Sequence, residues 1–215
     1  MDYEMHEEEI LDLLEFVSLE KRAKVKKYRF IKDAQRTLLG DVLARYLICH
    51  KTGVVNTGLC FENNAYGKPQ LITPPFVHFN ISHSGEWVVA AVSSYPVGID
   101  VEEIKEAPLV ISNRFFSKDE RLTLFKESKH CQNEAFYYLW TLKESYIKAE
   151  GKGLFMKLDT FTVGLGVTHI NGMELLNERL DERHVLGLCS AQGQVKHIEK
   201  SGLRMFIEKA KKNLG

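Results

Sequence analysis

Two long amphipathic segments, each ended by a glycine and each followed by short β-rich stretches, most constrain the fold of this chain. The segments cover residues 33–50 and 133–150, and Gly53 and Gly151 follow them. Apolar residues recur in both at the spacing of a buried helix face, and glycine commonly ends a helix. Strands are expected after each helix, at residues 77–81, 87–93, 97–101, 161–167 and 184–190.

A helix followed by strands, occurring twice, predicts an α+β protein made of two comparable halves that meet near residue 95. Because the β-rich stretches are short and separated by turn formers, the sheets are expected to be small and antiparallel. Residues 4–15 are acidic with apolar positions at helical spacing, which predicts a surface helix. The carboxy-terminal tail has the pattern of a basic amphipathic helix.

Composition excludes several classes of function. The 215 residues include 29 Lys and Arg against 29 Asp and Glu, so no overall field directs the chain to nucleic acid or an anionic membrane. The longest apolar stretch, 87–92, is far shorter than the roughly 20 residues of a membrane span, and the amino terminus lacks the pattern of a signal peptide. The four cysteines lie far apart without zinc-ligand spacing. We therefore expect a cytoplasmic protein with reduced thiols, without nucleic-acid or membrane partners.

A basic run at residues 21–27 holds five cations in seven positions, and Arg29 and Arg36 follow closely. Such a run is either a solvated helix face or a clamp for phosphate groups. The run alone does not decide between these two interpretations.

Asp100 and Glu102 alternate with apolar residues in the segment Gly98–Glu102. Since strand side chains alternate between faces, both carboxylates project from one face, about 7 Å apart. Two like charges at that spacing suit a hard divalent cation bound through oxygen, Mg²⁺ above all. The other interpretation is an acidic strand end that faces solvent.

Trp140, Glu144 and Lys148 stand at i, i+4 and i+8, on one stripe of the second long helix. An exposed Glu–Lys pair there would contribute only about 0.3–0.5 kcal/mol. The large aromatic side chain in the same stripe indicates that the stripe is covered. A covered glutamate and lysine need partners, such as a metal ion and a phosphate.

His83 follows an expected strand, between Ser82 and Ser84 and before Gly85. A lone histidine is more often structural, but this setting suits contact with a phosphate oxygen. Neither serine has the flanking glycines of a hydrolase nucleophile elbow, and no Walker-type GK[ST] occurs. Residues 66–69, Tyr-Gly-Lys-Pro, predict a turn that presents a lysine.

Together and in this order, these motifs resemble the phosphopantetheinyl transferases of the surfactin-synthetase type, which move 4′-phosphopantetheine from coenzyme A to a serine of a carrier protein. The signature patterns G-I-D-x-E and W-x-x-K-E-S-x-x-K stand intact at Gly98–Glu102 and Trp140–Lys148, and FNISHS precedes them at 79–84. The resemblance runs from residue 18 to about 165. It implies a pseudo-dimer of two similar α+β halves, residues 1–95 and 96–215, each a small antiparallel sheet packed with a long helix. Coenzyme A is then expected in the cleft between the halves.

The resemblance also implies roles for single residues. Asp100, Glu102 and Glu144 are expected to hold Mg²⁺ against the pyrophosphate. Catalysis is expected from Asp100, Glu144 and Lys148, with Lys148 facing the transferred phosphate and Glu144 acting as the base, directly or through a metal-bound water. Coenzyme A is expected to be bound by Lys21, Lys24, Arg36, Thr37, Lys68, Pro69, Ser82, His83 and Lys148. Glu120 matches an acidic position near the site.

The implied reaction is Mg²⁺-dependent transfer to an apo acyl or peptidyl carrier protein, which yields the holo-carrier and 3′,5′-ADP. The enzyme is expected to be a monomer whose two halves form the pseudo-dimer. One alternative is a noncatalytic coenzyme A or nucleotide binder of the same fold, which predicts a broken metal set, whereas all three acids are present. Another is a nucleic-acid-binding protein that uses residues 21–36. That alternative predicts a net positive charge, which the balance of 29 against 29 does not provide.

Overall fold

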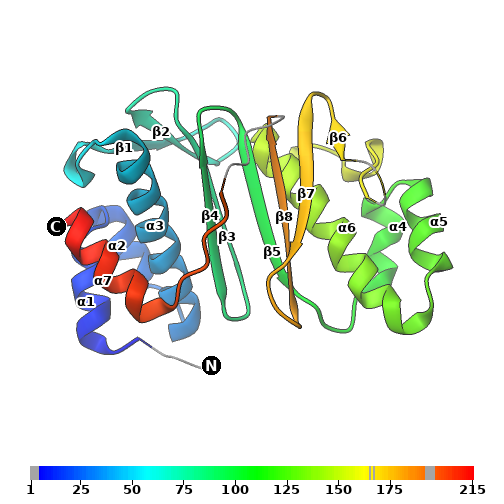
Figure 1. Ribbon diagram of the computed structural model, residues 1–215, viewed down its shortest axis with the longest axis horizontal. Coiled ribbons are helices and arrows are strands. Elements are labelled where there is room, and N and C mark those ends of the chain that lie inside the picture. The colour runs from blue at the N-terminus through cyan, green and yellow to red at the C-terminus, as the bar shows by residue number, and fades with distance from the viewer. Residues whose placement is uncertain (1–4, 165, 167, 192–196) are drawn as a thin grey trace.

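The computed structural model describes residues 5–164, 166, 168–191 and 197–215, and Figure 1 shows helices at both ends of the molecule with the strands between them. The helices are α1 (Glu7–Glu15), α2 (Leu19–Val25), α3 (Ile31–Thr52), α4 (Ser112–Phe115), α5 (Lys118–Lys126), α6 (Lys129–Glu150) and α7 (Leu203–Leu214). The strands are β1 (Cys60–Asn63), β2 (Pro69–Thr73), β3 (His78–Ser84), β4 (Trp87–Ser93), β5 (Val97–Glu103), β6 (His169–Ile170), β7 (Met173–Arg179) and β8 (His184–Ala191).

Each half contains a small antiparallel sheet covered by one long helix. In the first half β3 and β4 form a hairpin, which α3 covers, and β1 pairs with β2 in a second small hairpin. In the second half four strands follow the order β5-β8-β7-β6, and α6 covers β5 and β8. The predicted α+β fold, with two similar halves built from small antiparallel sheets and long helices, is confirmed.

The two halves meet where β5 lies beside β3 (Figure 1). Side chains of β3 reach the main chain of β5 at this interface: Asn80 Oδ1 accepts the N–H of Ile99 at 2.8 Å, and Ser84 Oγ accepts that of Glu103 at 3.1 Å. Buried amide groups need such partners, so these bonds fix how the strands are aligned. The residues predicted to be functional on β3 and β5 therefore face each other across the interface.

Both long helices end as the sequence predicted. Gly53 and Gly151 follow α3 and α6 with φ of 73° and 71°, the left-handed conformation that glycine adopts without steric cost. The start of α3 differs from the prediction, because the helix begins at Ile31. Asp33, where the predicted segment began, lies in the first turn of the helix and pairs with Arg36 at 2.8 Å.

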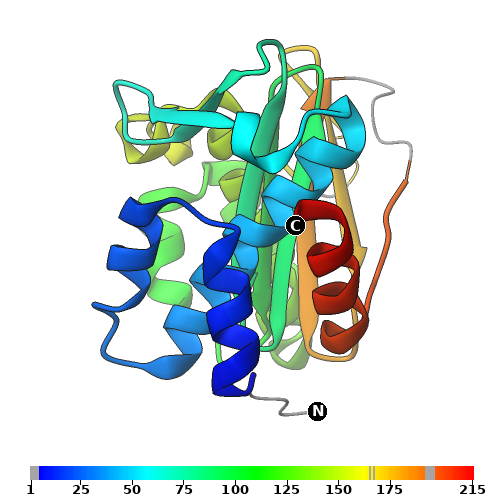
Figure 2. The same ribbon diagram turned by 90° about the vertical axis from the view of Figure 1, so that its left-hand side faces the viewer.

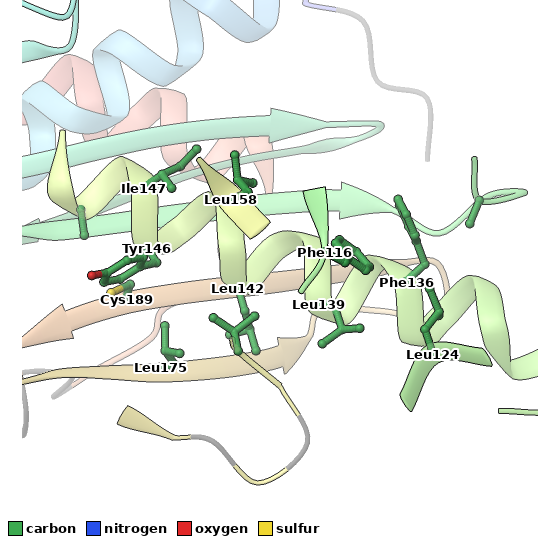
Figure 3. Packing of buried hydrophobic residues seen from close by; sticks show 13 residues of the cluster. Phe116, Leu124, Phe136, Leu139, Leu142, Tyr146, Ile147, Leu158, Leu175 and Cys189 are labelled. Atoms are coloured by element: carbon green, nitrogen blue, oxygen red, sulfur yellow. The ribbon is translucent and has the colours of Figure 1, made fainter. Parts of the chain in front are cut away.

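The core of the second half lies between α6 and the sheet, and Figure 3 shows its packing. Leu142 and Tyr146 of α6 contact a cluster that includes Leu175 of β7 and Cys189 of β8. The close approach of α6 to β5 requires glycine at position 98, since a Cβ there would lie 1.9 Å from the carbonyl oxygen of Ser145. This glycine thus brings the helix with Glu144 against the strand with Asp100.

The predicted strand at 161–167 is wrong for the described residues, and positions 165 and 167 lie outside them. The carbonyl of Phe161 accepts a hydrogen bond from Lys143 Nζ at 2.8 Å, and the N–H of Val163 donates to Glu120 Oε1 at 2.7 Å. Buried side chains therefore take main-chain groups that a strand partner would otherwise use. β8 pairs with β5 along one edge and with β7 along the other, and the residues of β7 do not follow a simple alternation of apolar and polar side chains.

The last helix, α7, lies on the helices of the first half, beside α1 and α3 (Figure 2). Its buried residues Phe206, Ile207, Ala210 and Leu214 share a cluster with Leu13 and Leu38. The end of the chain thus completes the core of the first half, and the division at residues 95 and 96 stays a prediction. Among the described residues, no helix combines the length and apolar character that a membrane span needs.

Candidate active site

Asp100 is a buried carboxylate at the centre of the interface between the halves, with 3% of its surface exposed. Its Oδ1 atom accepts hydrogen bonds from Lys148 Nζ at 2.6 Å and from Ser82 Oγ at 2.8 Å. Its Oδ2 atom is buried and has no hydrogen-bond partner among the residues that the structure describes. Burial raises the pKa of Asp100, and the ammonium group of Lys148 opposes that shift.

Glu102 and Glu144 lie close enough to Asp100 to affect each other's protonation. Burial and then the charge of Asp100 raise the pKa of Glu102, whose Oε2 atom accepts a hydrogen bond from Ser84 Oγ at 3.0 Å. Burial, together with the charges of Asp100 and Glu102, raises the pKa of Glu144 to about 7. The three acids therefore share one electrostatic environment. In the part of the chain that the structure describes, no group of three His, Cys, Asp or Glu side chains already has the arrangement of a metal site.

Trp140 lies on the same stripe of α6 as Glu144 and Lys148 and packs among aromatic side chains of the core. Its ring lies 5.9 Å from that of Phe136 in a stacked arrangement and 5.6 Å from that of Phe115 edge to face. This packing agrees with the expectation that the stripe is covered. Lys148 Nζ correspondingly finds partners within the protein, including Asp100 and Ser82 Oγ at 3.1 Å.

A cavity of about 380 Å³ draws its walls from both halves, and two of its lining residues, Ser82 and Lys148, donate hydrogen bonds to Asp100. Helix α2, the loop after it, helix α3, strand β3 and helix α6 contribute its lining residues Lys21, Lys24, Tyr28, Arg36, Thr37, Ile81, Ser82, His83 and Lys148. Seven of these nine positions are among those predicted to bind coenzyme A. Sequence reasoning missed Tyr28, which directly follows the basic run, and Ile81, which it treated as an ordinary strand residue.

Cations dominate this cavity, and several are held in place. Lys21 pairs with Asp41 at 3.1 Å. Arg36 donates to the carbonyl of Gly85 at 2.6 Å, which ties α3 to the end of the β3–β4 hairpin. Burial, and then the charge of Arg36, lowers the pKa of His83 and favours its neutral imidazole. A cavity with this charge suits an anionic ligand.

Lys68 and Pro69 are not among the residues that line the cavity. The predicted turn is present between β1 and β2, where the N–H of Asn64 donates to the carbonyl of Lys68. Lys68 Nζ donates to the main-chain carbonyl of Lys148, and Asn64 Nδ2 donates to that of Gly151 at 2.8 Å. The turn therefore holds the end of α6, and the role of Lys68 and Pro69 in coenzyme A binding stays a prediction.

Glu120 forms a fully buried ion pair with Lys143, at 2.9 Å with both side chains 0% exposed. Lys143 Nζ also donates to the carbonyls of Leu158 and Phe161. Glu120 accepts the N–H groups of Ser117 and Val163 at 2.7 Å. These contacts give Glu120 and Lys143 a structural role in the core beneath α6. Lys143 is the first lysine of the second signature pattern.

Two α+β halves join a cationic cavity to clustered carboxylates, an arrangement that suits a protein acting on a phosphorylated ligand. Residues 96–189 match the family model described as the 4′-phosphopantetheinyl transferase superfamily, and residues 2–95 match that of the 4′-phosphopantetheinyl transferase N-terminal region. The 4′-phosphopantetheinyl transferase ffp of Bacillus subtilis is 47% identical over 77% of this chain and 74% of its own length.

Two further relatives support the same assignment. The 4′-phosphopantetheinyl transferase Sfp of Bacillus subtilis (strain 168) is 46% identical over 77% of this chain and 74% of its own length. The human L-aminoadipate-semialdehyde dehydrogenase-phosphopantetheinyl transferase is 30% identical over 71% of this chain and 54% of its own length. The chain belongs to the 4′-phosphopantetheinyl transferase family, whose members are enzymes that transfer the phosphopantetheine group of coenzyme A to carrier proteins.

Proposed function

We propose that this enzyme transfers 4′-phosphopantetheine from coenzyme A to a serine hydroxyl of an apo acyl or peptidyl carrier protein, with 3′,5′-ADP as the second product. The observation that carries the proposal is the cationic cavity, which opens directly beside the buried carboxylates. Coenzyme A carries a pyrophosphate and a 3′-phosphate, and both need positive charge from the protein.

The cations of the cavity divide between the 3′-phosphate and the pyrophosphate of coenzyme A. Lys21, Lys24 and Arg36, with Thr37, bind the 3′-phosphate. Ser82 and His83 contact the pyrophosphate beside Lys148. Lys68 and Pro69 belong to a loop on the adenine side. The support for the first two groups is their position in one cavity, on α2, α3, β3 and α6.

Asp100, Glu102 and Glu144 fit a Mg²⁺ ion. A buried carboxylate oxygen without a hydrogen-bond partner, Asp100 Oδ2, offers a ligand atom, and three oxygen donors of like charge favour a hard divalent cation. Burial and then the charge of Asp100 raise the pKa of Glu102 and Glu144, and the repulsion between these charges falls when a cation binds. Bound there, Mg²⁺ supplies positive charge to the pyrophosphate.

The residues of the site provide positioning and proton transfer for the chemical step. The carrier serine oxygen attacks the β-phosphorus of coenzyme A, and the bond from that phosphorus to the oxygen of the leaving 3′,5′-ADP breaks. Glu144 accepts the serine proton, because burial and the charges of Asp100 and Glu102 increase its affinity for protons. Lys148 offsets the negative charge that develops on the phosphate oxygens.

We further propose that the enzyme acts as a monomer in the cytoplasm, without nucleic-acid or membrane partners. Residues from both halves of one chain line the cavity, so the site needs no second copy. The equal numbers of acidic and basic residues support the absence of a nucleic-acid partner.

Mass spectrometry of apo carrier proteins tests the proposed reaction. An acyl carrier and a peptidyl carrier, each incubated with coenzyme A, Mg²⁺ and the enzyme, are expected to yield at least one product about 340 Da heavier. Replacement of Mg²⁺ by a chelator should abolish the gain. Asp100→Asn should lower the rate at least about a hundredfold, because it removes a buried charge from the reacting centre.

The matched control is Asp119→Asn, which changes an exposed carboxylate on α5 and should leave the rate unchanged. A parent enzyme that adds no mass to either carrier would remove the proposed reaction. Full activity of Asp100→Asn would remove the assignment of the acids.

A further inference from the structure

The β3–β4 hairpin brings a second serine to the carboxylates, and the proposed reaction gives this serine no role. Ser84 Oγ lies 3.0 Å from Glu102 Oε2, while Ser82 Oγ lies 2.8 Å from Asp100 Oδ1. The serines are two residues apart on β3 and the acids are two residues apart on β5. Since side chains of a strand alternate between faces, the two serine–carboxylate contacts form matched pairs across the interface between the halves.

The hydrogen-bond partners of Ser84 fix the direction of its hydroxyl group. The main-chain N–H of Glu103 donates to Ser84 Oγ at 3.1 Å, so the oxygen already acts as an acceptor toward β5. A serine hydroxyl has one hydrogen to donate, and Glu102 Oε2 is the acceptor within reach. Ser84 thus bonds to the backbone and to a side chain of the same strand.

This arrangement restricts Glu102 more than packing alone would. A glutamate side chain has three rotatable bonds, and an outward carboxylate in solvent samples many rotamers. The bond from Ser84 holds one carboxylate oxygen and leaves the other oxygen for a ligand. Outer partners that orient a ligating carboxylate in this way commonly change metal affinity.

The end of the same hairpin is also bonded to helix α3 of the first half. The carbonyl of Gly85, the residue after Ser84, accepts the hydrogen bond from Arg36 at 2.6 Å. Arg36 lines the cationic cavity. One short segment therefore aligns a carboxylate of the second half with a cavity cation of the first half.

We propose that Ser84 is a positioning residue that orients Glu102 for divalent-cation binding. The inference rests on the proposed function, because it assumes that Asp100, Glu102 and Glu144 bind the cation. Ser84 acts through Glu102 and contacts neither coenzyme A nor the carrier serine.

Mn²⁺ binding to the full chain, measured by the electron paramagnetic resonance signal of free Mn²⁺, tests this role. Ser84→Ala should raise the Mn²⁺ dissociation constant by about tenfold, and Ser84→Thr, which keeps the hydroxyl, should restore it to within about threefold of the parent value. Ser93→Ala is the matched control: the Ser93 hydroxyl, on the same hairpin, also accepts a main-chain N–H at 3.1 Å, from Tyr95. This control should not change the dissociation constant.

A double-variant cycle separates positioning from a general structural effect. If Ser84 acts through Glu102, Ser84→Ala should change the dissociation constant less than about twofold in a Glu102→Gln background. At saturating Mg²⁺, the transfer rate of Ser84→Ala should return to within about threefold of the parent rate, with an unchanged KM for coenzyme A.

An unchanged dissociation constant in Ser84→Ala would overturn the inference and leave the proposed function intact. Equal losses in the parent and Glu102→Gln backgrounds would overturn it as well, because Ser84 would then act by another route. A parent that binds no Mn²⁺ would contradict the acid set itself and the inference with it. A parent that binds Mn²⁺ but modifies no carrier contradicts the proposed reaction alone, and the ratio of dissociation constants then still decides the role of Ser84.

Discussion

Lys68 donates from its ammonium group to two main-chain carbonyls, that of Val97 at the start of β5 and that of Lys148 near the end of α6. Burial lowers its pKa from 10.5 to about 8. Below pH 8 the group is charged in both the folded and the unfolded chain, so the full cost of burying the charge is present. Between pH 8 and 10.5 the folded chain releases the proton first, and that cost disappears as the pH rises.

Urea unfolding of the parent and of Lys68→Met at pH 7 and pH 10 measures this linkage. The free energy of unfolding of the parent, relative to the variant, is expected to increase by on the order of 1–2 kcal/mol between the two pH values. The range allows for solvent screening of a side chain that is only partly buried. The same comparison with Lys126→Met, which replaces an exposed lysine on α5, should give a difference in free energy of unfolding that is the same at both pH values. A difference between parent and Lys68→Met that stays constant with pH would contradict the account.

The family resemblance selected several single residues that the structure brings together in one cavity. Lys24, Arg36 and His83 line the cavity because α2, α3 and β3 converge there. Lys68 shows the limit of that reasoning. A sequence does not show which main-chain carbonyls accept hydrogen bonds from a lysine. In the structure, the carbonyls of Val97 and Lys148 accept them from Lys68.

At the scale of elements, the Glu120–Lys143 ion pair holds α5, α6 and residues 158–163 together. Removal of one partner leaves the other charge buried without compensation. Glu120→Ala should therefore lower the free energy of unfolding by about 3–5 kcal/mol in urea titration. The double variant Glu120→Leu with Lys143→Met, which removes both charges, should recover most of this loss.

An exposed pair serves as the control for that prediction. Lys209 and Glu199 lie 2.7 Å apart at the surface, and Glu199→Ala should leave the stability unchanged within error. If Glu120→Ala were equally harmless, the buried pair would not hold these elements together.

Element prediction succeeded where a long pattern had one interpretation and failed where tertiary contacts decided. Helices α3 and α6 have apolar stripes long enough to exclude a strand, and a glycine follows the carboxy-terminal end of each helix. Residues 161–163 are apolar enough for a strand, but Lys143 and Glu120 bind their main-chain groups. Strands β1, β2, β6 and β7 were not predicted, because β1, β2 and β6 are short and β7 does not alternate simply between apolar and polar residues, which leaves little periodic signal.

At the scale of the whole molecule, the site belongs to neither half alone. The first half supplies the cavity cations on α2 and α3, and the second supplies the acids on β5 and α6. The repeated pattern of helix and strands predicted this pairing of halves. The return of α7 to the first half was not predictable, because an amphipathic pattern shows that one face is buried without showing what buries it.

The central claim is that acids from β5 and α6 gather around one cation beside a cavity that holds coenzyme A. Crystals grown with coenzyme A and Mn²⁺ test it directly through the anomalous signal of the metal. The account predicts one Mn²⁺ peak with oxygens of Asp100, Glu102 and Glu144 at about 2.0–2.2 Å, and the 3′-phosphate against Lys21 and Lys24. A Mn²⁺ peak elsewhere in the molecule, or three carboxylates too far apart to share the ion, would contradict it.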